Sequence, residues 1–287
     1  MATLRDVKRK INSIRSTQTI TRTMRMISAS KLRRAQEELE KVEPYALRME
    51  DVLKRAISRV HDQGNPLLVE REEIKKVLLV AVASDRGLSG AFNLNVANAV
   101  ERFIREHKAD YGAIEVYVVG RKIRDYLRRR NIRATREWVD VKDIDSEAAG
   151  EMAREAANAY LGGECDKVYL IYTHFHSAVS QKIVLREFLP LKPTEADEGR
   201  NYLYEPDAQS IVDRFIPRYL FTRVYFALAE SQTSEHASRM AAMENATSNC
   251  GEMIDHLTLV YNKTRQQSIT NEMMDIVGGA EALQSEA

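Results

Sequence analysis

Apolar residues recur at alternating steps of three and four along the start of the chain. The series runs from Leu4 to Val60, and thirteen of its seventeen positions are apolar. A repeat that averages 3.5 residues keeps one apolar stripe, or seam, against a partner helix and gives a left-handed coiled coil. At 1.5 Å per residue, a helix of this extent is about 85 Å long. Pro44 is expected to bend this helix without ending it, because the seam resumes in register after it.

The seam is polar at four consecutive positions, Gln18, Thr21, Arg25 and Ser28. A coiled coil whose seam is polar for two heptads is either locally loosened or in contact with something other than its partner helix. The residues alone leave both alternatives open.

A second long helix is predicted from about Asp207, because an Asp that follows Pro206 favours a helix start. Its bulky apolar positions give way to small residues at steps of four and three. These residues are Ala227, Ser231, Ser234, Ser238 and Ala241. Small residues let two helices approach closely, so the two long helices are expected to pair with each other, antiparallel. Two ordinary long helices in a bundle are the alternative.

The middle of the chain alternates between strand-like and helical patterns. Residues 76–83 form a continuous apolar run, as expected for a strand buried on both faces. Further strands are predicted at 114–119, 168–173 and 183–189, and helices at about 95–106, 121–130 and 146–160. This succession predicts a Rossmann-like, doubly wound parallel sheet.

The expected fold is therefore an α/β protein with a long antiparallel coiled coil of N- and C-terminal helices and a central Rossmann-like parallel-sheet domain. The expected boundaries are residues 1–62 for the first coiled-coil helix, 75–205 for the central α/β domain and 207–284 for the second coiled-coil helix.

Charge is distributed unevenly, although the net charge is only +1. Residues 1–34 hold ten Lys or Arg against the single acid Asp6, and no Lys or Arg follows Arg265. A basic end and an acidic end favour a separate partner for each. Nucleic acid and an acidic protein surface both suit the basic end, so a coiled-coil nucleic-acid-binding protein is one hypothesis. Aromatic residues for base stacking are absent from residues 1–44.

The longest apolar run has seven residues, far fewer than the roughly 20 that span a bilayer. The N-terminal MATLRDVKRK lacks the apolar core of a signal peptide, which indicates a cytoplasmic chain. Cys165 and Cys250 lack CxxC spacing and are expected to be free, buried thiols.

The segment SDRGLSGAFN (84–93) follows the first predicted strand, where a doubly wound fold often binds phosphate. Its glycines do not have GxGxxG spacing, so a structural turn is favoured, with Asp85 and Arg86 as a local ion pair and Gly87 and Gly90 in unusual backbone conformations. A doubly wound enzyme with helical dimerisation arms is the alternative that this segment leaves open.

His174 and His176 lie on one face if their segment is a strand. With no third ligand nearby, they are expected to be exposed or capped histidines and not a metal site. No catalytic set can be assembled from the sequence, and no cofactor or metal is predicted.

Five segments carry a family resemblance that extends over essentially the whole chain. They are ITRTMRMISASKLRRAQ (20–36), SDRGLSGAFN (84–93), YLYEPD (202–207), SEHASRMAAMENATSNCGEMI (234–254) and VYNKTRQQSITNEMMDIVGGAEAL (260–283). The chain resembles the gamma subunit of bacterial F-type ATP synthases. The resemblance implies a non-catalytic rotor shaft inside a head of alpha and beta subunits. Its central domain would be a foot that joins the epsilon subunit and the c-ring, and nucleic acid is not an implied partner.

The resemblance also implies residue roles, and it implies that the polar stretch of the seam serves an external contact with a beta subunit. Contact with a beta subunit is implied for Met24, Arg25, Arg265, Gln266, Thr270 and Glu272, and contact with the c-ring or epsilon subunit for Tyr202, Tyr204 and Glu205. A peripheral place on the cytoplasmic face of the bacterial cell membrane follows from the same likeness. Cys250 stands where relatives often have Ala or Gly, and the dithiol insertion of chloroplast gamma subunits is missing.

Overall fold

The computed structural model describes residues 3–58, 65–141, 145–192 and 207–285. The chain divides into two compact units, one of residues 28–239 and one of residues 1–27 together with 240–287.

Two long helices, α1 (Leu4–Ile57) and α5 (Ala208–Ser285), contribute residues to both units. Every described seam position of α1, from Leu4 to Ala56, is buried or partly buried, including the polar ones. The 3.5-residue repeat therefore identified the packed face of this helix correctly over its whole length. Pro44 lies inside α1 and does not end it.

The unit of residues 28–239 is built on a five-stranded sheet with the order β3-β2-β1-β4-β5. Its strands are β1 (Lys76–Val82), β2 (Ala113–Val119), β3 (Arg136–Trp138), β4 (Lys167–Phe175) and β5 (Gln181–Leu189). β1 pairs in parallel with β2 and β4, and β2 pairs in parallel with β3. β5 pairs antiparallel with β4, so the expectation of a parallel sheet is wrong for that strand.

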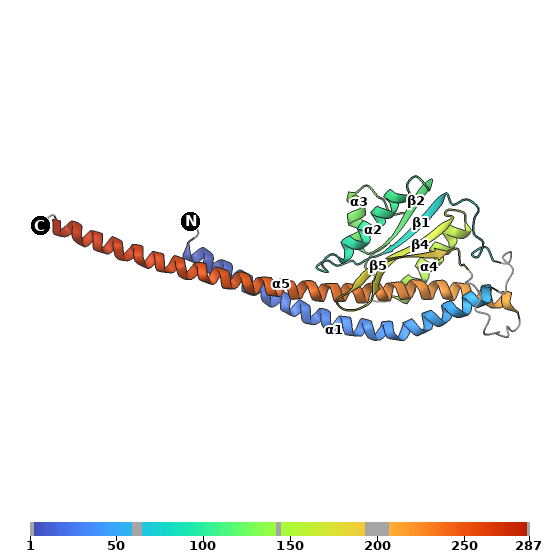
Figure 1. Ribbon diagram of the computed structural model, residues 1–287, viewed down its shortest axis with the longest axis horizontal. Coiled ribbons are helices and arrows are strands. Elements are labelled where there is room, and N and C mark those ends of the chain that lie inside the picture. The colour runs from blue at the N-terminus through green and yellow to red at the C-terminus, as the bar shows by residue number, and fades with distance from the viewer. Residues whose placement is uncertain (1–2, 59–64, 142–144, 193–206, 286–287) are drawn as a thin grey trace. The chain divides into compact units, whose positions relative to one another are not determined.

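Helices cover both faces of this sheet, because alternate residues of a strand point to opposite sides. Leu79 packs with residues of α2 (Phe92–His107) and α3 (Arg121–Arg129). Its neighbour Leu78 packs with α4 (Ser146–Leu161) and with the parts of α1 and α5 that belong to this unit. Figure 1 shows α2 and α3 beside one face of the sheet and α4 with α5 beside the other. The long helices are thus also part of the core of the α/β unit.

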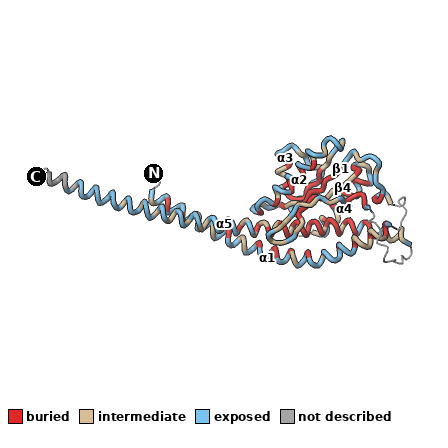
Figure 2. The backbone as a smooth tube through the Cα atoms, in the orientation of Figure 1, coloured by how far each residue is buried: buried red, intermediate tan, exposed pale blue. Residues whose placement is uncertain are grey.

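α5 changes character along its length. Its residues from Val212 to Met243 include many that are buried, whereas residues 269–278 and residue 280 are all exposed. Figure 2 shows the same change, with buried segments beside the sheet and an exposed C-terminal part. One helix therefore offers a core-forming segment and a segment whose surface is open.

Candidate partner-binding surface

The unit of residues 1–27 and 240–287 is a pair of antiparallel helical segments. The side-chain amide of Gln18 donates to the carbonyl oxygen of Thr247 at 3.3 Å, and Arg25 forms an ion pair with Glu244. From Gln18 to Arg25 the residue number rises on α1, whereas the number of the partner on α5 falls from Thr247 to Glu244. The predicted antiparallel pairing of the two terminal helices is confirmed in this unit.

The polar stretch of α1 faces its partner helix. Thr21 is only 8% exposed, and its hydroxyl lies 2.8 Å from that of Thr247. The interpretation of the polar seam as an external contact surface is therefore wrong for Gln18 and Thr21. Polar groups in a seam are tolerated when they find hydrogen-bond partners across it, and α5 supplies those partners here.

Large apolar side chains are exposed on the outside of this helix pair. They are Ile20, Met26 and Ile27 of α1, and Met253, Leu259, Val260, Ile269, Met273, Met274, Ile276 and Val277 of α5. On α5, Ile269, Met273 and Ile276 follow one another at steps of four and three, so they form a stripe along one face. An exposed apolar stripe of this kind marks a surface that a partner covers.

The predicted C-terminal contact residues lie along the same part of α5. Arg265, Gln266, Thr270 and Glu272 are all exposed. The hydroxyl of Thr270 donates to the carbonyl oxygen of Gln266 at 3.0 Å, and that of Ser268 donates to the carboxylate of Glu272 at 3.3 Å. These polar groups therefore flank the apolar stripe on a single helical segment.

The other predicted contact residues are placed differently. Met24 and Arg25 are partly exposed on α1, and the guanidinium of Arg25 is engaged by Glu244. Tyr202, Tyr204 and Glu205 lie outside the residues that the structure describes.

The segment SDRGLSGAFN forms a closed turn at the carboxyl end of β1. The side chain of Asn93 accepts from the amide of Ser84 at 2.9 Å and donates to the carbonyl oxygen of Arg86 at 3.1 Å. Asp85 accepts from the backbone amide of Arg121 at 2.8 Å, which is a different contact from the local ion pair expected with Arg86. Positive φ occurs at Leu88 and Gly90, not at Gly87. The segment is therefore a structural turn, as predicted.

α5 covers the sheet edge at which doubly wound folds bind their ligands. The hydroxyls of Ser231 and Ser234 lie within 3.5 Å of the carbonyl oxygens of Val82 and Thr173. The remaining hollow measures about 70 Å³, whereas ligand pockets usually measure about 300–1,000 Å³. The hypothesis of a doubly wound enzyme depended on a ligand site at this sheet edge, and α5 occupies that edge.

The same contacts correct the role of the small residues of α5. The serines bring the helix close to the sheet, not to α1, and Ala241 at the end of the series is exposed. Small side chains do allow close approach, but the surface approached was not evident from their spacing.

Sequence analysis missed a buried polar contact between α5 and β4. The imidazole Nδ1 of His174 contacts the carboxylate of Glu230, which is 1% exposed. Burial raises the pKa of Glu230 above that of an ordinary carboxyl, and His174, Tyr172 and Arg186 act in the opposite direction. An acid amid the small and apolar residues of ALAES (227–231) was the only signal in the sequence.

The remaining candidate ligand groups are accounted for individually. His176 is exposed beyond the end of β4 and donates its backbone amide to the carbonyl oxygen of Ser180. Among the described residues, no group of three or more potential metal ligands is found. Cys165 and Cys250 are free, as predicted, but only Cys165 is buried, and Cys250 is partly exposed. Burial raises the pKa of the Cys165 thiol to about 12.

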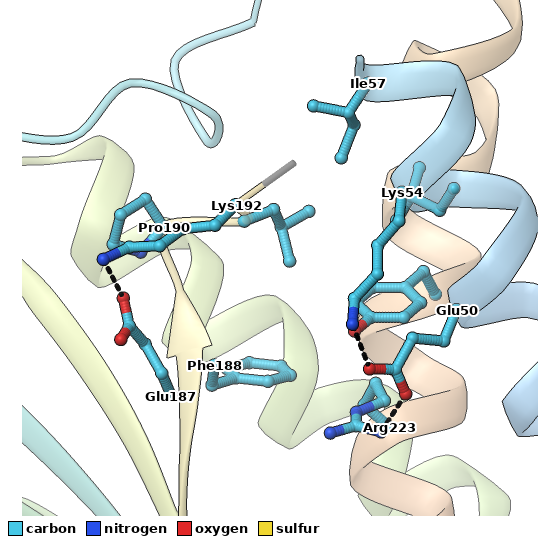
Figure 3. A pocket seen from close by; sticks show the side chains of 11 residues that line it. Glu50, Lys54, Ile57, Glu187, Phe188, Pro190, Lys192 and Arg223 are labelled. Atoms are coloured by element: carbon cyan, nitrogen blue, oxygen red, sulfur yellow. Dashed lines mark hydrogen bonds and ion pairs between the residues drawn. The ribbon is translucent and has the colours of Figure 1, made fainter. Parts of the chain in front are cut away.

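A crevice of about 170 Å³ lies where α1, α5 and the end of β5 meet. Figure 3 shows its charged side chains joined in pairs. Glu50 pairs with Lys54 at 2.9 Å and with Arg223 at 2.8 Å, and Lys192 pairs with Glu187 at 3.2 Å. Although burial acts to raise it, the pKa of Glu50 is lowered by Arg223 and Lys54. The pair of Glu50 with Arg223 therefore joins α1 to α5 on one side of the crevice, whereas Lys192 and Glu187 pair on the β5 side.

Comparisons with known proteins extend over the whole chain. A family model described as ATP synthase matches residues 3–283. An ATP synthase gamma chain from Syntrophobacter fumaroxidans is 46% identical over 99% of both chains. The chain belongs to the ATP synthase gamma chain family. A second gamma chain of the family, from Moorella thermoacetica, is 42% identical over 99% of this chain and 100% of its own length. The family predicted from the sequence motifs is confirmed.

Solved structures support the same assignment. A chain from the central stalk and c-ring of the Tetrahymena thermophila mitochondrial ATP synthase is 27% identical, with a TM-score of 0.60, and the match covers 79% of this chain and 99% of that one. A chain from the Euglena gracilis mitochondrial ATP synthase is 20% identical, with a TM-score of 0.69, and the match covers 98% of this chain and 95% of that one. This second likeness supports the fold alone. In the part of this chain that the structure describes, no helix has the length and apolar character of a membrane span.

Proposed function

We propose that this chain is the central rotor shaft of an F-type ATP synthase. It couples proton-driven rotation of the membrane c-ring to ATP synthesis or hydrolysis at the beta subunits and carries no catalytic site of its own. In this proposal residues 1–62 and 207–284 form the shaft and residues 75–205 form the foot. Its partners are the alpha and beta subunits, the epsilon subunit and the c-ring, and nucleic acid is not among them.

The observation that carries this proposal is the exposed apolar stripe on a helix pair in a chain of this family. Ile269, Met273 and Ile276 are each more than half exposed. Water alone does not favour such a stripe, so a partner that encloses the helices stabilises it. The central cavity of a head made of alpha and beta subunits has the form that this surface needs.

Contacts with beta are proposed for six residues, Met24, Arg25, Arg265, Gln266, Thr270 and Glu272. Their exposure or partial exposure supports the proposal. Exposed ion pairs contribute only about 0.2–1 kcal/mol each. Polar contacts of this kind therefore set the register with the head, and steric push by the paired helices carries most of the torque.

The foot contacts are proposed for Tyr202, Tyr204 and Glu205, toward the c-ring and the epsilon subunit, on the family motif YLYEPD alone. We also propose that the chain is a peripheral subunit on the cytoplasmic face of the bacterial cell membrane, which agrees with the membrane association of ATP synthase.

Reconstitution tests the proposal. The purified chain is mixed with the alpha and beta subunits of its own ATP synthase, and both co-purification and ATP hydrolysis are measured. The chain alone is expected to hydrolyse no ATP, and the mixture is expected to yield an active complex. Failure to co-purify with alpha and beta, or salt-dependent gel shifts of DNA by the chain alone, would overturn the proposal.

A pair of triple variants tests the surface itself. Ile269→Ser, Met273→Ser and Ile276→Ser together should reduce co-purification with alpha and beta without lowering the melting temperature, because these side chains are exposed. Val69→Ser, Leu161→Ser and Val179→Ser are the control, since they remove exposed apolar side chains from the α/β unit. Equal assembly of both triple variants would argue against the stripe as the surface that enters the head.

A further inference from the structure

A strongly basic surface lies on the α/β unit, apart from the shaft surfaces discussed above. Residues 121–136 contain eight Lys or Arg and the single acid Asp125. They include α3, whose apolar residues Ile123 and Leu127 are buried against the sheet. The opposite side of α3 is therefore left with charged side chains in contact with solvent.

Half of these cations are neutralised within the chain. Arg124 pairs with Asp125 at 2.8 Å, and Arg136 pairs with Glu155 at 3.0 Å. Arg121 and Arg130 are likewise held by Asp140 and Glu101. These pairs fix the positions of their arginines and leave little charge for a partner.

The other four cations, three on α3 and one shortly after its end, form what we term the basic face of α3. They are Lys122, Arg128, Arg129 and Arg133, all exposed, and none forms an ion pair with another residue that the structure describes. Three of the four, together with Asp125, line a hollow of about 440 Å³. Converging cations at a concave surface attract an anionic group and fix its orientation, because guanidinium groups bind carboxylates bidentately.

The shape and composition of the hollow distinguish between anionic partners. A membrane surface is flat and is favoured by exposed apolar residues that insert into it, and no large apolar side chain of α3 is exposed. Single-stranded nucleic acid requires open aromatic faces. The one aromatic ring of α3, that of Tyr126, is engaged by the guanidinium of Arg130, 5.6 Å from its centroid, and its hydroxyl donates to Asn98 and Glu101. Because the carboxylate of Asp125 is paired with Arg124, the cations that line the hollow would suit a protruding acidic segment of a protein.

We propose that the basic face of α3 is a docking surface for an acidic protein segment, one rich in Asp and Glu and poor in apolar residues. The inference goes beyond the rotor function, since it concerns neither the helix pair nor the foot contacts proposed for Tyr202, Tyr204 and Glu205. It is tested on the chain alone, so its outcome is independent of assembly with alpha and beta.

Fluorescence anisotropy of a labelled peptide of twelve alternating Glu and Asp residues, titrated with the full chain, is the primary measurement. Binding should weaken as salt is added, because the contact is between exposed charges. The variant Lys122→Gln, Arg128→Gln, Arg129→Gln should bind the peptide about tenfold or more weakly, as expected for the loss of three charge pairs. The matched control, Lys8→Gln, Arg9→Gln, Lys10→Gln, removes the same charge from exposed positions of α1 and should bind within about twofold of the unaltered chain.

Two further ligands complete the test. Vesicles of phosphatidylglycerol with phosphatidylcholine, and a single-stranded DNA of twenty nucleotides, are titrated under the same salt conditions. The proposal would be overturned if the α3 triple variant lost more affinity for the vesicles or the DNA than for the peptide. Equal peptide affinity of the two triple variants would also overturn it. Melting curves of both variants establish that each is folded, and the variant Lys122→Gln alone, with an expected intermediate loss, replaces the triple variant if that protein does not fold.

Discussion

The imidazole of His174 contacts the carboxylate of Glu230 and so joins β4 to α5 at a buried position. The two partners differ in their access to water, because the side chain of His174 is 36% exposed and that of Glu230 is 2% exposed. The carboxylate therefore depends on its protein neighbours. One oxygen of Glu230, Oε2, has no hydrogen-bond partner among the described residues. Glu230 therefore docks α5 on the sheet with only part of its hydrogen-bonding capacity used.

Removal of the histidine should destabilise the α/β unit. His174→Ala leaves the buried carboxylate of Glu230 without this contact, at an expected cost of about 1–3 kcal/mol in the free energy of unfolding. Urea denaturation measures it. His176→Ala is the control, since this exposed residue lies beyond the strand, and it should change the free energy by less than about 0.5 kcal/mol.

Neutralisation of the acid should reduce the dependence of stability on pH. Burial raises the folded-state pKa of Glu230 above its unfolded value, so its contribution favours folding below the unfolded pKa and is lost as the pH rises through the folded pKa. Glu230→Gln removes that loss and keeps a group that can contact His174. Between about pH 4 and pH 8 the variant should lose less stability than the unaltered chain. Parallel curves for the two proteins would contradict the expected protonation of Glu230.

Gly120 occupies a position that no other residue fits. Its φ is +104°, and a Cβ atom there would lie 2.8 Å from backbone atoms of Ser84. Gly120→Ala should therefore lower the free energy of unfolding by at least about 2 kcal/mol. Gly278→Ala provides the contrast, because this glycine lies in the exposed part of α5 with no atom near the added methyl group. It should raise helical stability by about 0.5–1 kcal/mol, and thermal melting followed by circular dichroism distinguishes the two results.

Periodicity predicted the helices and most of the sheet because both depend on local sequence. The seam of α1 and the buried run of β1 follow directly from steps of 3.5 and from continuous apolarity. β3 was missed because three residues, Arg136–Trp138, carry no detectable period. The antiparallel pairing of β5 was overlooked although the sequence held a signal for it. Only residues 176–180 separate β4 from β5, too few for the crossover that a parallel strand needs.

The contact surfaces were less predictable, because spacing identifies a face without identifying what the face meets. Ser231 and Ser234 lie at a helical spacing that suits a second helix and a sheet edge equally, and the sheet is the surface they approach. The polar seam at Gln18 and Thr21 required knowledge of Thr247, more than two hundred residues away. By contrast, the exposed segment that holds Arg265 was found through a family motif, a source of information that periodicity does not contain.

The hydroxyl pair in the seam should show energetic coupling. Thr21→Val and Thr247→Val each leave one hydroxyl without its cross-helix neighbour, whereas the double variant gives an apolar seam at that level. Each single change should cost about 0.5–1.5 kcal/mol, and the double variant should cost less than the sum of the two. The four free energies come from urea unfolding followed by helical circular dichroism. Thr19→Val, an exposed position on the same helix, is the control, and additive effects would mean that the two hydroxyls do not interact.

Arg25 allows the proposed contact with beta to be separated from the internal ion pair. Both members of the pair with Glu244 are more than a third exposed, so Arg25→Ala should change the free energy of unfolding by no more than about 1 kcal/mol. If Arg25 also contacts a beta subunit, the variant should lower the ratio of ATP synthesised to protons transported in reconstituted vesicles. Glu244→Ala breaks the same internal pair but leaves the cation in place, so its coupling should remain near that of the unaltered enzyme. Equal loss of coupling in both variants would assign the effect to the ion pair itself. A large loss of stability in Arg25→Ala with normal coupling would instead show that Arg25 stabilises the folded seam and does not contact the head.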